Sequence, residues 1–158
     1  GSQDSLGIVY PGLNKFYYNN GYWPDKITSV CEEEILNWLE EHIYMIPLYP
    51  RHNSYNVLEN THINEAGVKA LSMAADITWS AILKRDIEML GKGITDSFEA
   101  QIAMFPSMVD DDILAALNEY KKDAIGWKLS GAGGGGYFIF IAKNPESREG
   151  MNIKMRRE

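Results

Sequence analysis

The sequence predicts an α+β domain in which helices cover one face of a sheet. Segments rich in β-branched and aromatic residues lie near both ends of the 158-residue chain, and the middle follows helical periodicity. Strands and helices do not alternate regularly, which argues against the parallel sheet of a repeated βαβ protein. Hydrophobic residues make up 45% of the chain, enough for a buried core. No internal repeat or low-complexity segment is present.

The N-terminal region is expected to form a β-hairpin or meander. Residues 8–18 are rich in β-forming side chains but are interrupted by Pro11 and Gly12. The turn signal Asn19-Asn20-Gly21 then precedes Tyr22 and Trp23.

A short helix and a strand are expected next. Residues 32–41 place apolar side chains on one face and acids on the other, as an amphipathic helix does. Residues 42–49 are apolar and partly β-branched, which indicates a strand. Because proline lacks an N–H group, Pro47 should lie at an edge, a bulge or the end of that strand.

Three further helices are predicted in the middle of the chain. The longest starts at about Ile63, and Gly91 and Gly93 are expected to end it. The second carries apolar residues at helical spacing from Ile94 and stops at Pro106. The third opens with Asp110, Asp111 and Asp112 and ends on Lys121 and Lys122, which complements the helix dipole. This dipole accounts for the three acids, and we expect no metal site there.

Two strands are predicted to flank a glycine-rich loop near the C-terminus. They cover about residues 125–129 and 137–142, and the alternating residues 153–156 could add an edge strand. Between the two strands, five of the six residues from Gly131 to Gly136 are glycine, a composition that destabilises any helix or strand. The backbone must therefore turn sharply here or approach another group closely.

The glycine-rich loop has two interpretations. Successive N–H groups can form a nest that accepts anionic oxygens, such as those of a phosphate. Alternatively, the glycines only allow a tight hairpin. The pattern Gly131, Gly133, Gly136 is formally a G-x-G-x-x-G, but a dinucleotide site requires a helix after it, and a strand follows here.

Composition limits the classes of function. A net charge of −7 argues against binding to nucleic acid, and no apolar run is long enough to cross a membrane. The single cysteine, Cys31, excludes an internal disulfide and fits a reducing compartment. The first residues lack the features of a signal peptide, so we expect a cytoplasmic location.

Few other side chains suggest chemistry. His42, His52 and His62 do not have metal-ligand spacing, and no nucleophile motif is present. Arg51 lies in a polar loop after the strand at 42–49, where a guanidinium could bind a phosphate or carboxylate with two hydrogen bonds.

The stretch Lys128-Leu129-Ser130-Gly131-Ala132-Gly133-Gly134-Gly135-Gly136, with helices before it and a strand after it, resembles the third motif of the GHMP small-molecule kinases. Within that superfamily the chain is most similar to the heptose-phosphate kinase and L-fucokinase branch. Tyr49-Pro50-Arg51, the long helix and Phe105-Pro106-Ser107-Met108-Val109-Asp110 recur there in this order. Gln3-Asp4-Ser5-Leu6-Gly7 is similar to a segment of the sugar-kinase members.

The resemblance implies a ferredoxin-like C-terminal kinase domain and assigns roles to particular residues. Backbone N–H groups of Ser130, Gly131, Ala132, Gly133, Gly134 and Gly135 would contact the phosphates of ATP, which such kinases use with Mg²⁺. Asp4 would orient or deprotonate the acceptor hydroxyl, and Arg51 is a candidate for binding a substrate anion. No metal ligand is assigned.

The same resemblance implies an N-terminal domain with a Pro-x-x-x-Gly-Leu-Gly-Ser-Ser nucleotide loop, which these 158 residues do not contain. We therefore expect residues 1–30 to be a β segment at the end of such a domain and residues 31–158 to be the C-terminal domain. The predicted function is the C-terminal part of a sugar or sugar-phosphate kinase, inactive alone and able to form a homodimer.

Two other functions remain open at this stage. The chain could be a non-catalytic ligand-binding or dimerisation module derived from such a kinase. It could also be an unrelated ferredoxin-like regulatory domain that binds a small metabolite, in which residues 130–136 only form a turn.

Overall fold

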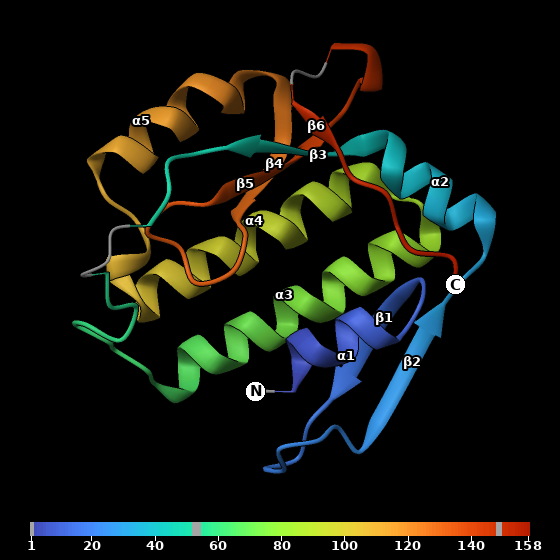
Figure 1. Ribbon diagram of the computed structural model, residues 1–158, viewed down its shortest axis with the longest axis horizontal. Helices are drawn as coiled ribbons and strands as arrows, with labels where there is room; N and C mark the ends of the chain where they lie inside the picture. The colour runs from blue at the N-terminus through green and yellow to red at the C-terminus, as the bar shows by residue number, and fades with distance from the viewer. Residues whose placement is uncertain (1, 52–54, 148–149) are drawn as a thin grey trace.

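A four-stranded antiparallel sheet lies at the centre of the molecule, with the strand order β4-β5-β3-β6 (Figure 1). The computed structural model describes residues 2–51, 55–147 and 150–158. The strands are β3 (Ile43–Pro47), β4 (Ala124–Leu129), β5 (Tyr137–Ala142) and the two-residue β6 (Met151–Asn152). The predicted α+β class with an antiparallel sheet is thus confirmed. Pro47 ends its strand, which is one of the positions expected for it.

Four longer helices in the described part of the chain follow the apolar periodicity of the sequence, and three of them begin at a capping side chain. They are α2 (Glu33–His42), α3 (Glu65–Lys84), α4 (Ile87–Met104) and α5 (Asp111–Tyr120), with short 3₁₀ turns at Pro106–Met108, Lys121–Asp123 and Pro145–Ser147. The side chains of Asn64, Asp86 and Asp110 each accept the N–H of the residue three positions later. These caps satisfy N–H groups that have no partner within the helix.

The core consists of two clusters. In the first, Phe138 and Phe140 of β5 pack against Tyr44 of β3, Phe98 of α4 and Ile113 of α5. The Tyr44 and Phe140 rings are stacked, with centroids 5.5 Å apart.

The second cluster joins the sheet to the helices α2, α3 and α4. Ile141 of β5 packs there with Leu39, Ile82 and Leu90, and Leu13 lies at its border. Residues far apart in the chain, such as Leu39 and Ile141, which are 102 positions apart, thus share one core and fix the helices against the sheet.

The N-terminal region differs in part from the prediction. It begins with α1 (Gln3–Val9), followed by a hairpin of β1 (Leu13–Tyr17) and β2 (Lys26–Val30). Ile8 and Val9 were expected in a strand but end α1, because the Arg156 guanidinium binds their carbonyl oxygens. Such a contact between the two ends of the chain overrides local β propensity.

The boundary between the two long helices also differs from the prediction. Helix α3 ends at Lys84, where Arg85 adopts a left-handed conformation with φ 54°. Gly91 and Gly93 therefore do not end α3 but lie inside α4. A Cβ atom at Gly91 would come within 2.5 Å of the Ile125 carbonyl oxygen, so this glycine allows α4 to approach β4 closely.

The C-terminal residues 153–158 do not form the expected edge strand, and we call them the C-terminal strap. The buried Glu40 carboxylate of α2 accepts the Lys154 ammonium and the Met155 N–H, both at 2.7 Å, and binds the Arg157 guanidinium. The Gly12 N–H donates to the Arg156 carbonyl at 2.7 Å. The strap therefore ties α2 to the N-terminal region.

Candidate functional site

The glycine loop, residues 130–136, connects β4 to β5 and is fixed at three points. The Ser130 N–H donates to the Tyr137 carbonyl at 2.9 Å, and the Gly136 N–H donates to the Tyr49 carbonyl at 3.0 Å. Between them, the Gly134 N–H donates to the Met108 carbonyl at 2.9 Å. The loop therefore lies against the segment after β3 and the turn before α5.

Part of the glycine requirement is structural. All five glycines of the loop have positive φ, a region that residues with side chains rarely adopt. At Gly133 a Cβ atom would also lie 2.5 Å from the Met108 carbonyl oxygen. The backbone of this turn therefore requires glycine, and this requirement is compatible with a binding role.

The structure brings Arg51 to the glycine loop, although 82 positions separate it from Gly133. The Arg51 Nε donates to the Gly133 carbonyl at 2.7 Å, and the guanidinium lies 6.0 Å from the centre of the Tyr55 ring. The Tyr55 hydroxyl in turn donates to the Ala132 carbonyl at 2.6 Å. Two features that the sequence suggested separately thus form one site.

Several donors in this site have no hydrogen-bond partner among the described residues, although Gly133 and Gly135 are buried and only Gly131 and Ala132 are exposed or half-buried. Within the described part of the chain, the N–H groups of Gly131, Ala132, Gly133 and Gly135 make no hydrogen bond. The same holds for the terminal nitrogens of Arg51, which is exposed. A group of backbone N–H donors beside a guanidinium can bind an anion such as a phosphate.

Two carboxylates, those of Asp110 and Asp112, lie close enough to Tyr49 beside the loop to affect its pKa. Asp110 accepts the Tyr49 hydroxyl and also caps α5 through the Ile113 N–H at 2.9 Å. Burial, together with the nearby Asp110 carboxylate, raises the pKa of Tyr49 well above its usual range. Tyr49 therefore stays neutral and serves as a hydrogen-bond donor that holds Asp110 in its capping position.

Asp4 lies in the first turn of α1 and is exposed. Among the described residues, no contact joins it to the glycine loop. Its neighbour Gln3 lines a cleft of about 760 Å³ between β1 on one side and α3, α4 and β4 on the other.

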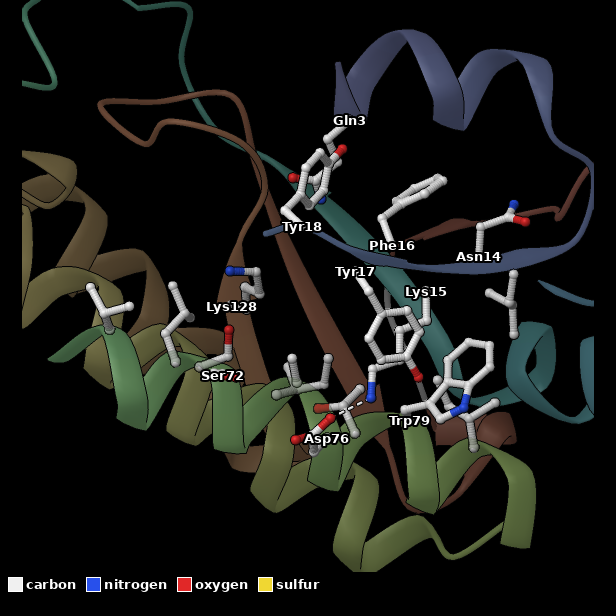
Figure 2. A pocket seen from close by; sticks show the side chains of 18 residues that line it. Gln3, Asn14, Lys15, Phe16, Tyr17, Tyr18, Ser72, Asp76, Trp79 and Lys128 are labelled. Carbon is white, nitrogen blue, oxygen red and sulfur yellow. Dashed lines mark hydrogen bonds and ion pairs between the residues drawn. The ribbon is translucent and has the colours of Figure 1, made fainter. Parts of the chain in front are cut away.

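Sequence reasoning did not assign a role to this cleft or to Lys128, which lines it (Figure 2). Lys128 is half-buried, and its ammonium donates to the Gln101 side-chain oxygen. Burial lowers the pKa of Lys128 to about 8. The available signal was a lysine between Trp127 and Leu129 in a strand that was otherwise expected to be apolar.

A second lysine, Lys15, also lines the cleft and forms an ion pair with Asp76 of α3. Burial alone would lower the pKa of Lys15, but the hydrogen bond and charge of Asp76 outweigh it and raise that pKa above its usual value.

The described residues contain no cluster of three or more metal-ligating side chains. No helix among these residues is both long and apolar enough to cross a membrane.

Comparisons with known proteins give consistent results. Residues 80–151 match the family model described as GHMP kinases C terminal. L-fucokinase/L-fucose-1-P guanylyltransferase from Bacteroides fragilis is 22% identical over 171 residues, and the match covers 93% of this chain but 16% of that protein.

Solved structures share the fold. A mevalonate kinase matches with a TM-score of 0.60 and 19% identity over 86% of this chain and 41% of that one. A D-glycero-D-manno-heptose 1-phosphate kinase from Bacteroides thetaiotaomicron matches with a TM-score of 0.57 and 15% identity, over 99% and 45% of the two chains. The chain thus spans about a sixth of the L-fucokinase and less than half of each structure.

Proposed function

Because residues 80–151 match the GHMP kinase C-terminal family model and the chain is similar to sugar kinases, we propose that it is the C-terminal part of an ATP-dependent kinase that phosphorylates a sugar or sugar phosphate. One observation carries this proposal: Arg51 Nε donates to the Gly133 carbonyl beside four N–H groups of the glycine loop that have no hydrogen-bond partner among the described residues. In this arrangement the guanidinium and the N–H groups bind the phosphate oxygens of the nucleotide, so we propose a nucleotide-binding role for Arg51 in place of the substrate-anion role expected from the sequence.

Transfer of a phosphoryl group depends mainly on positioning and on neutralising the charge of the transferred group. The glycine loop supplies fixed dipoles and Arg51 supplies a positive charge. Asp4 orients the acceptor hydroxyl or accepts its proton. ATP and Mg²⁺ supply the phosphoryl group and its charge compensation in the complete enzyme.

A kinase of this type also needs the nucleotide loop that these 158 residues do not contain. We therefore propose that the chain is inactive alone, that residues 1–30 form the end of the N-terminal domain and that residues 31–158 form the C-terminal domain. A cytoplasmic location fits a kinase that uses ATP and small sugars.

The test compares this chain with a polypeptide extended upstream through any nucleotide loop. We expect the extended wild type to bind Mg-ATP in calorimetric titration and to phosphorylate L-fucose or a heptose phosphate. The variant Arg51→Gln should weaken Mg-ATP binding about tenfold, whereas Arg85→Gln, which removes an arginine paired with Glu34, should not. If the extended wild type neither binds nor transfers phosphate, the kinase function is wrong.

The alternative is a non-catalytic ligand-binding or dimerisation module. Large apolar side chains of the N-terminal region are exposed, with Ile8 73% exposed, Val9 63% and Trp23 59%. Exposed apolar side chains of this kind favour association, including a homodimer. Gel filtration that shows a monomer at all concentrations would contradict the dimer.

A further inference from the structure

The cleft between β1 and α3 has the size and lining of a small-molecule site. Its volume of about 760 Å³ lies within the range of ligand pockets. Aromatic side chains, among them Tyr17 and Trp79, line it together with aliphatic residues and with polar and charged groups. Such a lining suits a sugar, whose ring has both apolar faces and hydroxyl groups.

The polar groups follow one face of α3. Ser72, Asp76 and Trp79 are spaced four and three residues apart, so they lie on the same side of the helix over a length of about 10 Å. In Figure 2, Ser72 lies beside Lys128 at one end of the cleft and Trp79 lies at the other, with the ion pair of Lys15 and Asp76 between them.

Lys128 differs from Lys15 in its surroundings. Lys15 is paired with the Asp76 carboxylate, but the structure gives the ammonium of Lys128 only a neutral partner, the Gln101 amide, among the described residues. Removing a charge from water without an opposite charge costs free energy. An anionic group bound in the cleft would offset that cost.

The position of Lys128 connects the cleft to the glycine loop. Lys128 lies two residues before Ser130 at the end of β4, about 7 Å along the strand. At the opposite wall, Gln3 borders the cleft directly before Asp4. A sugar in this cleft would therefore lie between the phosphate-binding loop and the proposed acid-base residue.

We propose that this cleft binds the acceptor as a phosphorylated sugar, with Lys128 contacting its phosphate and Trp79 lying against its ring. The inference rests on the proposed kinase function, and it narrows the substrate from sugars in general to sugars that already carry a phosphate. The phosphate at Lys128 could also be the one transferred from the nucleotide, so the experiment separates the two sources.

The experiment measures binding of hexose and heptose phosphates, free mannose and Mg-ATP to the 158-residue chain. Calorimetry and tryptophan fluorescence report the affinity, and ¹⁵N NMR reports the affected residues. We expect mannose 1-phosphate or another member of the panel to bind at least tenfold more tightly than free mannose and to shift the Trp79 indole signal. Lys128→Met should weaken this binding about 10- to 100-fold, and Lys128→Arg should restore most of it.

Lys143→Met is the matched control, because Lys143 pairs with Glu88 on the surface and does not line the cleft. Circular dichroism checks that each variant is folded. Equal binding of mannose and its phosphates, no effect of Lys128→Met, or no saturable binding of any sugar phosphate would overturn the inference. So would a loss of Mg-ATP binding alone in Lys128→Met, because it would place the nucleotide phosphate at Lys128.

The two proposals fail separately. Arg51→Gln should weaken Mg-ATP binding and leave sugar-phosphate binding unchanged. If sugar phosphates bind through Lys128 while Mg-ATP does not bind to the glycine loop in either polypeptide, the cleft assignment holds and the kinase function is wrong.

Discussion

Glu40, which binds the C-terminal strap, contributes to the stability of the fold by an amount that follows from its pKa. Its carboxylate is 3% exposed and accepts hydrogen bonds from Lys154, Met155 and Arg157. Burial alone would raise the pKa of Glu40, but these hydrogen bonds outweigh burial and hold it at about 2 instead of 4.5. Glu40→Gln keeps the shape of the side chain while it removes the charge.

The fall in pKa from 4.5 to about 2 corresponds to about 3 kcal/mol. Because the Lys154 side chain is 77% exposed and its charge is screened by water, we expect Glu40→Gln to lower the free energy of unfolding by about 2 to 3 kcal/mol. For a chain of this length the melting temperature should fall by about 5 to 10 °C.

The pH dependence gives a second readout. Since the folded-state pKa is lower than the unfolded-state value, the contribution of Glu40 is present above about pH 4.5 and is lost as the pH falls towards 2. Melting curves followed by circular dichroism should therefore differ strongly between wild type and Glu40→Gln at pH 7 and converge in acid. Glu119→Gln, an exposed change on α5, should melt like the wild type. If Glu40→Gln also melts like the wild type at pH 7, the strap does not contribute to stability.

Four further substitutions test the packing of the glycine loop and of α4. Gly133→Ala should lower the free energy of unfolding by about 2 to 4 kcal/mol and Gly131→Ala by only about 1 kcal/mol. The reason is that a Cβ atom meets the Met108 carbonyl at Gly133 but only the Arg51 side chain at Gly131. Equal losses of stability in urea unfolding would contradict the close contact at Gly133. Gly91→Ala should destabilise the protein although alanine favours helices by about 1 kcal/mol, since its Cβ would meet the Ile125 carbonyl; a stabilised variant would refute this packing. Tyr55→Phe should cost about 1 kcal/mol by removing the hydrogen bond to Ala132, which thermal melting would detect.

Local patterns were sufficient to predict most of the sheet and the long helices. The run from Tyr137 to Ala142 is a strand with those bounds, and Asp110 begins the last helix as its capping side chain indicates. These predictions succeeded because strand propensity and helix capping depend on residues close together in the sequence.

The predictions that failed depend on contacts between distant residues. Gly91 was expected to end a helix, but only the approach of β4 explains a glycine there. Ile8 was expected in a strand, and Arg156 at the other end of the chain holds it in a helix terminus. Neither partner can be identified from the local sequence.

The candidate site was partly accessible from the sequence. The glycine loop and Arg51 were identified as separate features, but their contact depends on the return of β5 beside β3. Lys128 was part of the glycine motif, yet its position in a cleft depends on β1, which lines the cleft opposite α3. The roles of Asp4 and Arg51 stay predictions.

The central claim is that the glycine loop and Arg51 bind the phosphates of a nucleotide, and NMR titration with Mg-ATP of the ¹⁵N-labelled polypeptide extended upstream through any nucleotide loop tests it most directly. We predict saturable shifts of the Gly131, Ala132, Gly133 and Gly135 amide signals, with an affinity about tenfold weaker in Arg51→Gln. Unchanged loop signals at saturating Mg-ATP, or shifts that do not depend on Arg51, would contradict the claim and leave the glycines with a structural role only.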